Sequence, residues 1–249
     1  MIQNSFIFLP RITPKKEKII WSQNVHSWDD FLKTEQIKGV TEAKKPSYDR
    51  LINDAKKHLI DDNEKFFKEV FPTGETWRLY NQFKNDVCFL DIETTGYYGD
   101  ITVLGLYDGH DTKTFVKGQS LFKDKIEDEL SKYKMLITFN GASFDLPVIR
   151  RQFNIDFNVP HIDLRFAAKK IGLSGGLKKI EHEIGIKRAD EVQGVTGEDA
   201  VMLWRQYRAT GEKKYLDLLV QYNEEDIINL KQLSEYVIPR LWKQTRDIN

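Results

Sequence analysis

The chain has 249 residues, of which 40% are hydrophobic and 31% charged, and its 38 basic residues balance 38 acidic ones. This composition excludes a disordered or low-complexity chain, and the single cysteine, Cys88, excludes an internal disulfide. Because the net charge is zero, any attraction to nucleic acid must come from local clusters of basic residues. Overall charge therefore neither supports nor excludes a polyanionic partner.

The sequence carries no sign of a membrane or secretory segment. No apolar run approaches the roughly 18–20 residues that a membrane span needs. The first residues also lack a charged segment followed by an apolar signal core. We therefore expect a cytoplasmic protein that does not bind membranes, and the sequence identifies no protein partner.

The first 80 residues carry helical patterns and few strand signals. Apolar residues recur at helical spacing in segments 28–32, 48–60 and 64–70. The run Pro72-Thr73-Gly74 then interrupts this pattern, and a strand-rich segment begins after Asn85. We predict a helical N-terminal region over residues 1–80 and a second domain over residues 81–249.

Three antiparallel strands are predicted to open the second domain. Residues 87–93 are apolar on both faces until the end, as in a central strand that is covered on both sides and includes Cys88 as a core residue. Residues 101–107 and 112–116 form two further strands, joined by the turn dipeptide Asp108-Gly109.

Parallel crossover strands and helices are predicted to follow. Residues 121–133 have the pattern of a helix, residues 135–139 of a fourth strand, and residues 146–153 of another helix. After Asp163 the pattern is helical almost to the end. The predicted fold class is α/β, with a mixed sheet flanked by helices.

Two acidic residues end the first predicted strand. Strand alternation places Asp91 and Glu93 on the same face, with Cα atoms about 6.6 Å apart. Because an isolated buried carboxylate is costly, such a pair indicates a charged or metal-bound partner. The alternative is a strand that simply runs out into solvent.

A third carboxylate follows the fourth strand. In the run from Asn140 to Asp145, the acidic residue lies at the start of a helix and near the carboxyl edge of the sheet, where sites of α/β proteins form. The alternatives are a helix cap for Asp145 and a turn residue for Asn140. For His161 and Asp163, at the next junction between strand and helix, a cap is the favoured interpretation.

A fourth carboxylate lies on the apolar stripe of the last helix. Tyr222 and Asp226 share this stripe with three leucines, at spacings of three and four residues: Leu219, Leu230 and Leu233. The stripe offers Asp226 no basic residue within reach, so the carboxylate requires another partner. A functional role and a structural hydrogen bond both remain open.

The three segments together resemble the motifs of the DEDD exonuclease superfamily, which has a ribonuclease H-like fold. In chain order they are Asp91-x-Glu93, Asn140-x-x-x-Phe144-Asp145 and Tyr222-x-x-x-Asp226. The tyrosine form of the third motif is similar to that of polymerase proofreading domains and ribonuclease D, whereas the histidine branch has four residues between its histidine and aspartate. The resemblance covers residues 86–235.

The resemblance implies the cofactor and the role of each residue. Asp91, Glu93, Asp145 and Asp226 would bind two Mg²⁺ or Mn²⁺ ions, for which hard oxygen ligands are suited. Asp91 would bridge the two ions, Asp145 would reach the second mainly through water, and Tyr222 would position the attacking water. A zinc site is not supported, because one Cys and five scattered His show no ligand spacing.

Four further residues are expected to contact the substrate. Thr94 and Asn140 belong to the first two motifs, and the segment from Ser174 to Lys179 offers flexible backbone amides with two cations, Lys178 and Lys179. The alternative for this segment is a turn followed by a solvated helix face. Lys187-Arg188 would extend the same basic track, and Tyr97-Tyr98 would either pack or stack on a terminal base.

The expected activity is 3′-to-5′ hydrolysis of single-stranded DNA or RNA ends, with a structure-selective endonuclease and a non-catalytic adaptor as alternatives. More narrowly, the whole chain resembles predicted exonucleases with a helical N-terminal extension. In such extensions a hairpin usually carries a Gly-hydrophobic-Gly turn, whereas this chain has Arg11-Ile12-Thr13. Without these glycines we expect the hairpin to serve packing instead of binding the DNA backbone.

Overall fold

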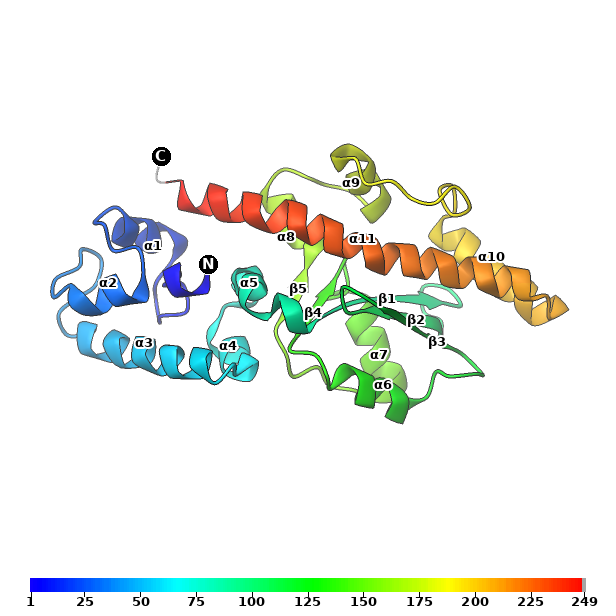
Figure 1. Cartoon of the computed structure of the whole chain (residues 1–249), viewed down its shortest axis with the longest axis horizontal. Coiled ribbons are helices and arrows are strands. Elements are labelled where there is room, and N and C mark those ends of the chain that lie inside the picture. The colour runs from blue at the N-terminus through cyan, green and yellow to red at the C-terminus, as the bar shows by residue number, and fades with distance from the viewer. Residues whose placement is uncertain (248–249) are drawn as a thin grey trace.

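A five-stranded mixed sheet forms the centre of the computed structural model, which describes residues 1–247 (Figure 1). The strands are arranged in the order β3-β2-β1-β4-β5 and are β1 (Val87–Thr94), β2 (Ile101–Tyr107), β3 (Thr112–Val116), β4 (Met135–Thr138) and β5 (His161–Asp163). The central strand β1 pairs antiparallel with β2 and parallel with β4. The predicted α/β fold class, with antiparallel strands followed by parallel ones, is thereby confirmed.

Helices precede the sheet, as the sequence predicts. They are α1 (Pro14–Trp21), α2 (Trp28–Lys33), α3 (Lys45–Ile60), α4 (Glu64–Val70) and α5 (Tyr80–Phe83), with 3-10 turns at η1 (Ile2–Asn4), η2 (Thr73–Leu79) and η3 (Lys84–Asp86). At two of these helices, side chains cap the N-terminus. Ser27 and Asp30 form a reciprocal capping box at α2, and the side chain of Asn63 accepts from the backbone of Phe66 at α4.

Within the described part of the chain, six helices accompany and follow the strands. They are α6 (Lys123–Leu130), α7 (Asp145–Phe153), α8 (Leu164–Lys170), α9 (Leu177–Ile184), α10 (Gly197–Thr210) and α11 (Lys213–Arg246). The prediction of a helix over residues 121–133 is wrong at both ends. Leu121 belongs to the turn after β3, because its N–H donates to the carbonyl of Val116, and the helix ends with Ser131 as its C-cap.

Side chains of β1 alternate between two hydrophobic layers. Val87 and Phe89 pack in the layer that contains α8 and α11, whereas Cys88, Leu90 and Ile92 pack in the layer on the opposite face, with α6 and α7. Cys88 is fully buried, which confirms its prediction as a core residue. By the same alternation, the residues after Phe89 at every second position face α11.

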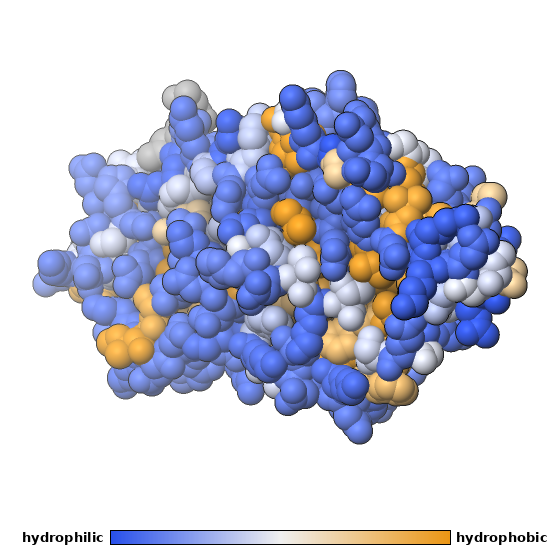
Figure 2. Space-filling model, turned by 45° about the vertical axis from the view of Figure 1, so that its right-hand side comes forward, coloured by the Kyte–Doolittle hydropathy of each residue, from blue (hydrophilic) through white to orange (hydrophobic). Residues whose placement is uncertain are grey.

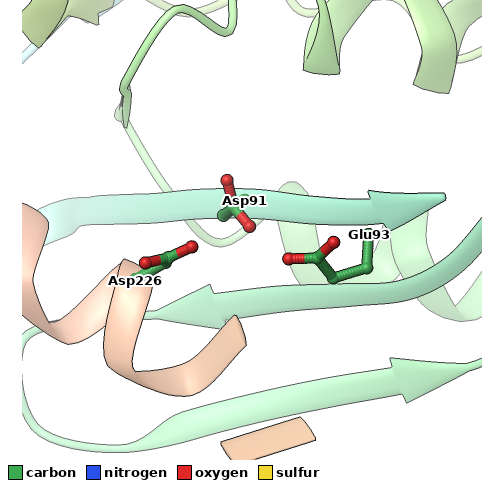
Figure 3. A group of neighbouring side chains, drawn as sticks. All are labelled: Asp91, Glu93 and Asp226. Atoms are coloured by element: carbon green, nitrogen blue, oxygen red, sulfur yellow. The ribbon is translucent and has the colours of Figure 1, made fainter. Parts of the chain in front are cut away.

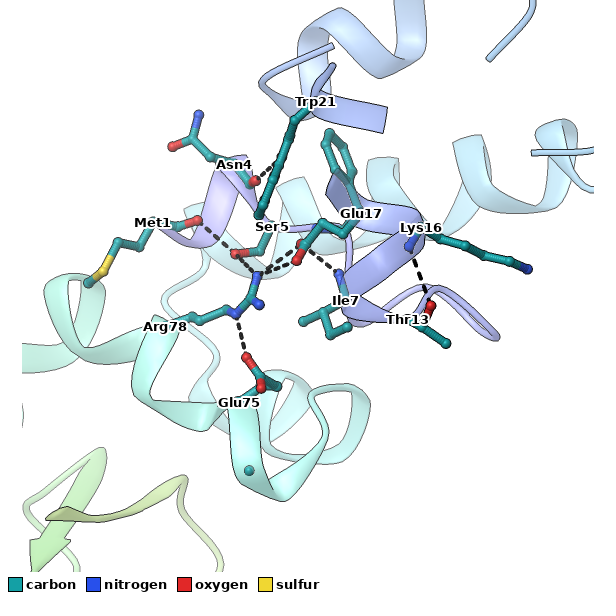
Figure 4. Close-up of polar contacts among 12 residues, drawn as sticks. Met1, Asn4, Ser5, Ile7, Thr13, Lys16, Glu17, Trp21, Glu75 and Arg78 are labelled. Carbon is teal, nitrogen blue, oxygen red and sulfur yellow. Dashed lines mark hydrogen bonds and ion pairs between the residues drawn. The ribbon is translucent and has the colours of Figure 1, made fainter. Parts of the chain in front are cut away.

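The N-terminal helices are joined to the rest of the chain by a buried ion pair (Figure 4). Arg78 of η2 and Glu17 of α1 are 1% and 0% exposed, and the guanidinium donates to the carboxylate over 2.8 Å. Glu17 also accepts from the backbone N–H groups of Phe6 and Ile7, and Arg78 donates to Glu75. All charges of this network have partners within the chain.

The N-terminal helices also pack against the C-terminal end of α11. The ring centroids of Trp21 and Trp242 lie 6.0 Å apart, and Lys18 donates to the backbone carbonyl of Asp247 over 2.5 Å. One continuous hydrophobic cluster extends from Ile2 to Leu241. The long helix α11 therefore links the sheet with the N-terminal helices.

The predicted N-terminal hairpin packs on its neighbours. Arg11 has a positive φ of 65°, the conformation that favours glycine, so the turn forms without a glycine at this position. Ile12 beside it is buried, and the hydroxyl of Tyr48 donates to the carbonyl of Pro10 over 2.6 Å. These contacts agree with the expected packing role.

The face shown in Figure 2 is mostly hydrophilic, and its apolar groups gather mainly in the right-hand half. Among residues 1–247, none of the helices is both long and apolar enough to cross a membrane.

Candidate active site

Three carboxylates converge between β1 and α11 (Figure 3). Asp91 and Glu93 follow Phe89 at alternate positions of β1 and therefore face the helix, from which Asp226 points back toward them. One ligand oxygen from each of the three lies within 4.8 Å of the others. The structure thus brings together carboxylates that are far apart in the sequence.

The helix α11 supplies two of the predicted residues on one face. Tyr222 and Asp226 are separated by about one helical turn and are 6% and 7% exposed, respectively. The neighbouring carboxylates Asp226, Glu93 and Asp91 all raise the pKa of the Tyr222 phenol, after burial as the largest cause. The phenol is therefore neutral and lies within the field of the carboxylate cluster.

The fourth carboxylate, Asp145, reaches β1 where its neighbouring strand ends. The pairing of β1 with β4 extends to Phe89 and Ile137, and beyond it the N–H of Ile92 donates to Asp145 Oδ1 over 3.2 Å. The side chain is 3% exposed at the first residue of α7. Its negative charge raises the pKa of Asp91, which places it within electrostatic reach of the other three carboxylates.

Burial and mutual repulsion make the four carboxylates weak acids. Desolvation is the largest cause in each case, and the neighbouring carboxylates add to it, so the pKa values of Asp91 and Glu93 lie well above their ordinary values. The pKa is raised to about 7 for Asp145 and to about 6 for Asp226. Such a cluster stores repulsion that a bound cation would relieve.

The orientation of Asp91 depends on two residues that the sequence analysis missed. Asn223 of α11 donates its amide N–H to Asp91 Oδ2 over 2.8 Å. The amide fits against the sheet because β2 has Gly105 opposite Asp91, where a Cβ atom would lie 2.0 Å from Asn223 Oδ1. A glycine within an otherwise apolar strand is a sequence signal of such a close approach.

Two cations enter the cluster from the segment around α9. Arg188 contacts Asp226 and also donates twice to Glu181, at 2.7 and 2.8 Å. The ammonium of Lys178 lies 4.4 Å from the ring centroid of Tyr222, and its charge lowers the pKa of Glu93. Lys178 thus reaches the site, whereas Arg188, expected on a surface track, is buried within it.

A cavity of approximately 750 Å³ opens beside Glu93. Its lining includes Thr94 and Tyr97 from the end of β1 and the loop after it, Phe144 before α7, and the first residues of α10. Tyr97 and Tyr98 are 73% and 86% exposed, so they do not pack in the core. Of the four carboxylates, Glu93 lines the cavity, which is open to solvent.

Two of the residues predicted to contact the substrate, Asn140 and Lys179, do not line the cavity beside Glu93. Asn140 has a positive φ of 67° and accepts from Arg165 over 2.6 Å, and Lys179 is exposed. Asp163 caps α8 by accepting from the N–H of Arg165, and it also accepts from the N–H of Asn140. The expected capping role of Asp163 is therefore observed. The same carboxylate also holds the backbone of Asn140, the first residue of the second motif.

Comparison with known proteins identifies the superfamily. Residues 88–238, which include all four carboxylates, match the RNase_H superfamily. The chain belongs to this superfamily. Among solved structures it is similar to the family B DNA polymerase from the hyperthermophilic archaeon Pyrobaculum calidifontis, with a TM-score of 0.51 and 13% identity. The similarity covers 61% of this chain and 24% of the polymerase, and at this identity it shows a shared fold. No curated protein matches the chain.

Proposed function

We propose that the protein is a metal-dependent 3′-to-5′ exonuclease of the tyrosine-bearing DEDD branch that acts on single-stranded DNA or RNA ends. The observation that carries this proposal is the convergence of Asp91, Glu93 and Asp226 within 4.8 Å. Membership of the RNase_H superfamily supports a nuclease, and the order of the three motifs supports the exonuclease.

The residues of the cluster fit divalent cations. Their donors are carboxylate oxygens, which Mg²⁺ and Mn²⁺ prefer. Burial is the largest cause of their raised pKa values, and repulsion between the neighbouring carboxylates adds to it. Asp91, Glu93 and Asp226 would hold one ion, and Asp91 and Asp145 the second. When bound, two ions supply electrostatic stabilisation to the attacking and leaving oxygens of phosphodiester hydrolysis.

Tyr222 is suited to hold the attacking water in place. Because burial and the neighbouring carboxylates raise the pKa of its phenol, the hydroxyl retains its proton at neutral pH and is a poor base. A neutral hydroxyl can donate one hydrogen bond and accept another, which fixes the direction of a water molecule. Tyr222 therefore acts by positioning.

The cavity beside Glu93 would receive the terminal nucleotide. Thr94 lines it directly, and the exposed ring of Tyr97 offers a surface for stacking on a base. The buried ammonium of Lys178, which lies 4.4 Å from the ring centroid of Tyr222, would face the phosphate. An unpaired strand end exposes both base and phosphate to these groups.

The test compares labelled single- and double-stranded DNA and RNA with Mg²⁺, with Mn²⁺ and with chelator. We expect the single-stranded substrates to shorten from the 3′ end, with no reaction in chelator. A 3′-terminal phosphorothioate and a circular single strand should both resist. The variant Asp91→Ala, purified in the same way, measures contaminating nuclease.

Three outcomes would contradict the proposal. Cleavage of the circular substrate would identify an endonuclease of the same fold. Binding of the strand without hydrolysis under any metal condition would identify an adaptor. Equal hydrolysis by Asp91→Ala and the unmodified protein would remove the carboxylate cluster from the mechanism.

A further inference from the structure

Arg188 makes the connection between α9 and the carboxylate cluster. It follows α9 in the chain and donates through Nε and Nη2 to the two oxygens of Glu181, at 2.7 and 2.8 Å. The same Nη2 donates to Asp226 Oδ1. The side chains of Arg188, Glu181 and Asp226 are 5%, 2% and 10% exposed, so this chain of contacts is shielded from water.

The geometry at Glu181 makes Arg188 rigid. A guanidinium that donates two parallel hydrogen bonds to one carboxylate is fixed in both position and plane. Because the second N–H of Nη2 then points at Asp226, the orientation of the Asp226 carboxylate is determined from outside α11. Arg188 also lies 5.9 Å from the ring centroid of Tyr222, so it borders both site residues of the helix.

Only one oxygen of Asp226 is used in this contact. The bond from Arg188 goes to Oδ1, and the Asp226 carboxylate still offers an oxygen to the cluster with Asp91 and Glu93 (Figure 3). The two functions of the carboxylate are thus compatible. A divalent cation would bind on the side of Asp226 that faces Asp91.

We propose that Arg188, anchored by Glu181, is a positioning residue that orients Asp226 for divalent cation binding. The proposal rests on the proposed function, since it assumes that the carboxylate cluster binds a cation. It extends the site beyond the three sequence motifs, to Glu181 of α9 and to Arg188 of the loop between α9 and α10.

An alternative role for Arg188, as a simple counter-ion, predicts the opposite change in cation affinity when the arginine is removed. If Arg188 served only as a counter-ion that stands in for a cation, its removal would strengthen cation binding, because a positive charge would leave the site. If it positions Asp226, its removal weakens binding despite the lost repulsion. Outer contacts of this kind typically change metal affinity by about 10–100-fold.

The experiment measures Mn²⁺ binding by isothermal titration calorimetry to the full chain and its variants. We expect Arg188→Gln to weaken binding by about 10–100-fold and Glu181→Gln, which keeps the arginine but loosens it, to weaken binding less. Arg188→Lys should recover part of the loss. Lys187→Gln removes an exposed cation from the same loop and should leave the affinity unchanged.

A kinetic measurement adds a readout that general loss of structure would not produce. The Mn²⁺ concentration that gives half-maximal hydrolysis should rise in Arg188→Gln, while kcat at saturating Mn²⁺ should recover most of its original value. A fall in kcat with an unchanged Mn²⁺ requirement would contradict positioning of the ligand.

The outcomes separate this inference from the proposed function. If the unmodified protein binds no Mn²⁺, the proposed function fails. If it binds Mn²⁺ and Arg188→Gln binds equally or more tightly, the positioning role is overturned while the nuclease proposal stands. Should Arg188→Gln not fold, Glu181→Gln carries the test, and unchanged affinity in that folded variant would overturn the inference.

Discussion

Two buried charged networks in this chain differ in how their charges are compensated. Near the N-terminus, Arg78 pairs with Glu17 and Glu75, and Glu75 is also bound by Lys170, so positive and negative groups match. In the site, Asp91, Glu93 and Asp226 converge, Asp145 lies within electrostatic reach of them, and Glu181 is connected to Asp226 through Arg188. Only two cations, Lys178 and Arg188, enter that cluster among the described residues.

The comparison separates structural charge from functional charge. A buried ion pair that is complete within the chain needs no ligand, and loss of one partner leaves an uncompensated buried charge. A cluster of buried carboxylates with too few cations is destabilising by itself and gains from an added cation. We therefore expect the loss of one partner to destabilise the fold in the first network, and a bound cation to stabilise the second.

The largest expected effect comes from removing one charge of the site. Glu93→Gln should reduce hydrolysis at least about 10³-fold, since a cation ligand supplies several kcal/mol to the transition state. The side chain has no hydrogen-bond partner among the described residues, so the melting temperature in chelator should be unchanged or higher. A large drop in that temperature would make Glu93 a structural residue.

The matching change in the N-terminal network should have the reverse pattern. Arg78→Met leaves the carboxylate of Glu17 buried without its cation and should cost about 3–5 kcal/mol in the free energy of unfolding. The activity per folded molecule should be unchanged. Urea unfolding measures the change in free energy, and hydrolysis normalised to the folded fraction measures the activity. A loss of unfolding free energy below about 1 kcal/mol would show that the ion pair is not important for stability.

An intermediate effect is expected from Gly105→Ala. The added methyl would meet Asn223 Oδ1 at 2.0 Å, so either β2 or Asn223 must shift, at a cost of about 1–3 kcal/mol. Displacement of Asn223 also removes the hydrogen bond to Asp91 and should lower activity. In the double variant with Asn223→Ala, stability should recover while activity stays low. Recovery of both would show that Asn223 does not orient Asp91.

An effect no larger than that of Gly105→Ala is expected on the pH dependence of the free energy of unfolding. Burial raises the pKa of Asp145 from 3.8 to about 7, so the folded protein holds this proton to higher pH than the unfolded chain does. The stability that Asp145 contributes is therefore full below its ordinary pKa and is lost as pH rises through about 7.

Asp145→Asn should remove this loss. In chelator at pH 8 we expect the variant to exceed the unmodified protein by about 1–3 kcal/mol, with a smaller difference at pH 5. Added Mn²⁺ should stabilise the unmodified protein more than the variant. The exposed Asp124→Asn serves as the control, and equal pH profiles for all three proteins would refute the raised pKa.

Much of the fold is predictable from local patterns. The segments predicted as strands over residues 101–107 and 112–116 coincide with β2 and β3, because apolar runs bounded by Asp108-Gly109 define both ends locally. The helix predicted over residues 121–133 is too long, because hydrogen bonds to the turn after β3 hold Leu121 outside it. Apolar spacing alone does not reveal those bonds.

The candidate site is predictable where one element determines it. Strand alternation places Asp91 and Glu93 on one face, and the helical stripe places Asp226 against the sheet. The partner of Asp226 could not be predicted, because Arg188 approaches from a loop 38 residues away in the sequence. The role of Asn223 could not be predicted for a related reason. It depends on the space left by Gly105 of β2, and the sequence does not show that Gly105 lies beside Asn223.

Because one helix, α11, contacts both the sheet and the N-terminal helices, the number of residues between its two contact points fixes the directions in which their side chains point. Asp226 and Trp242 lie on the same helix, about 24 Å apart at 1.5 Å per residue. One residue inserted between them would turn one end by about 100° relative to the other. Trp242 could then no longer meet Trp21 while Asp226 faces β1. An insertion of seven residues, close to two full turns, would lengthen the helix but nearly preserve the relative directions of the two side chains.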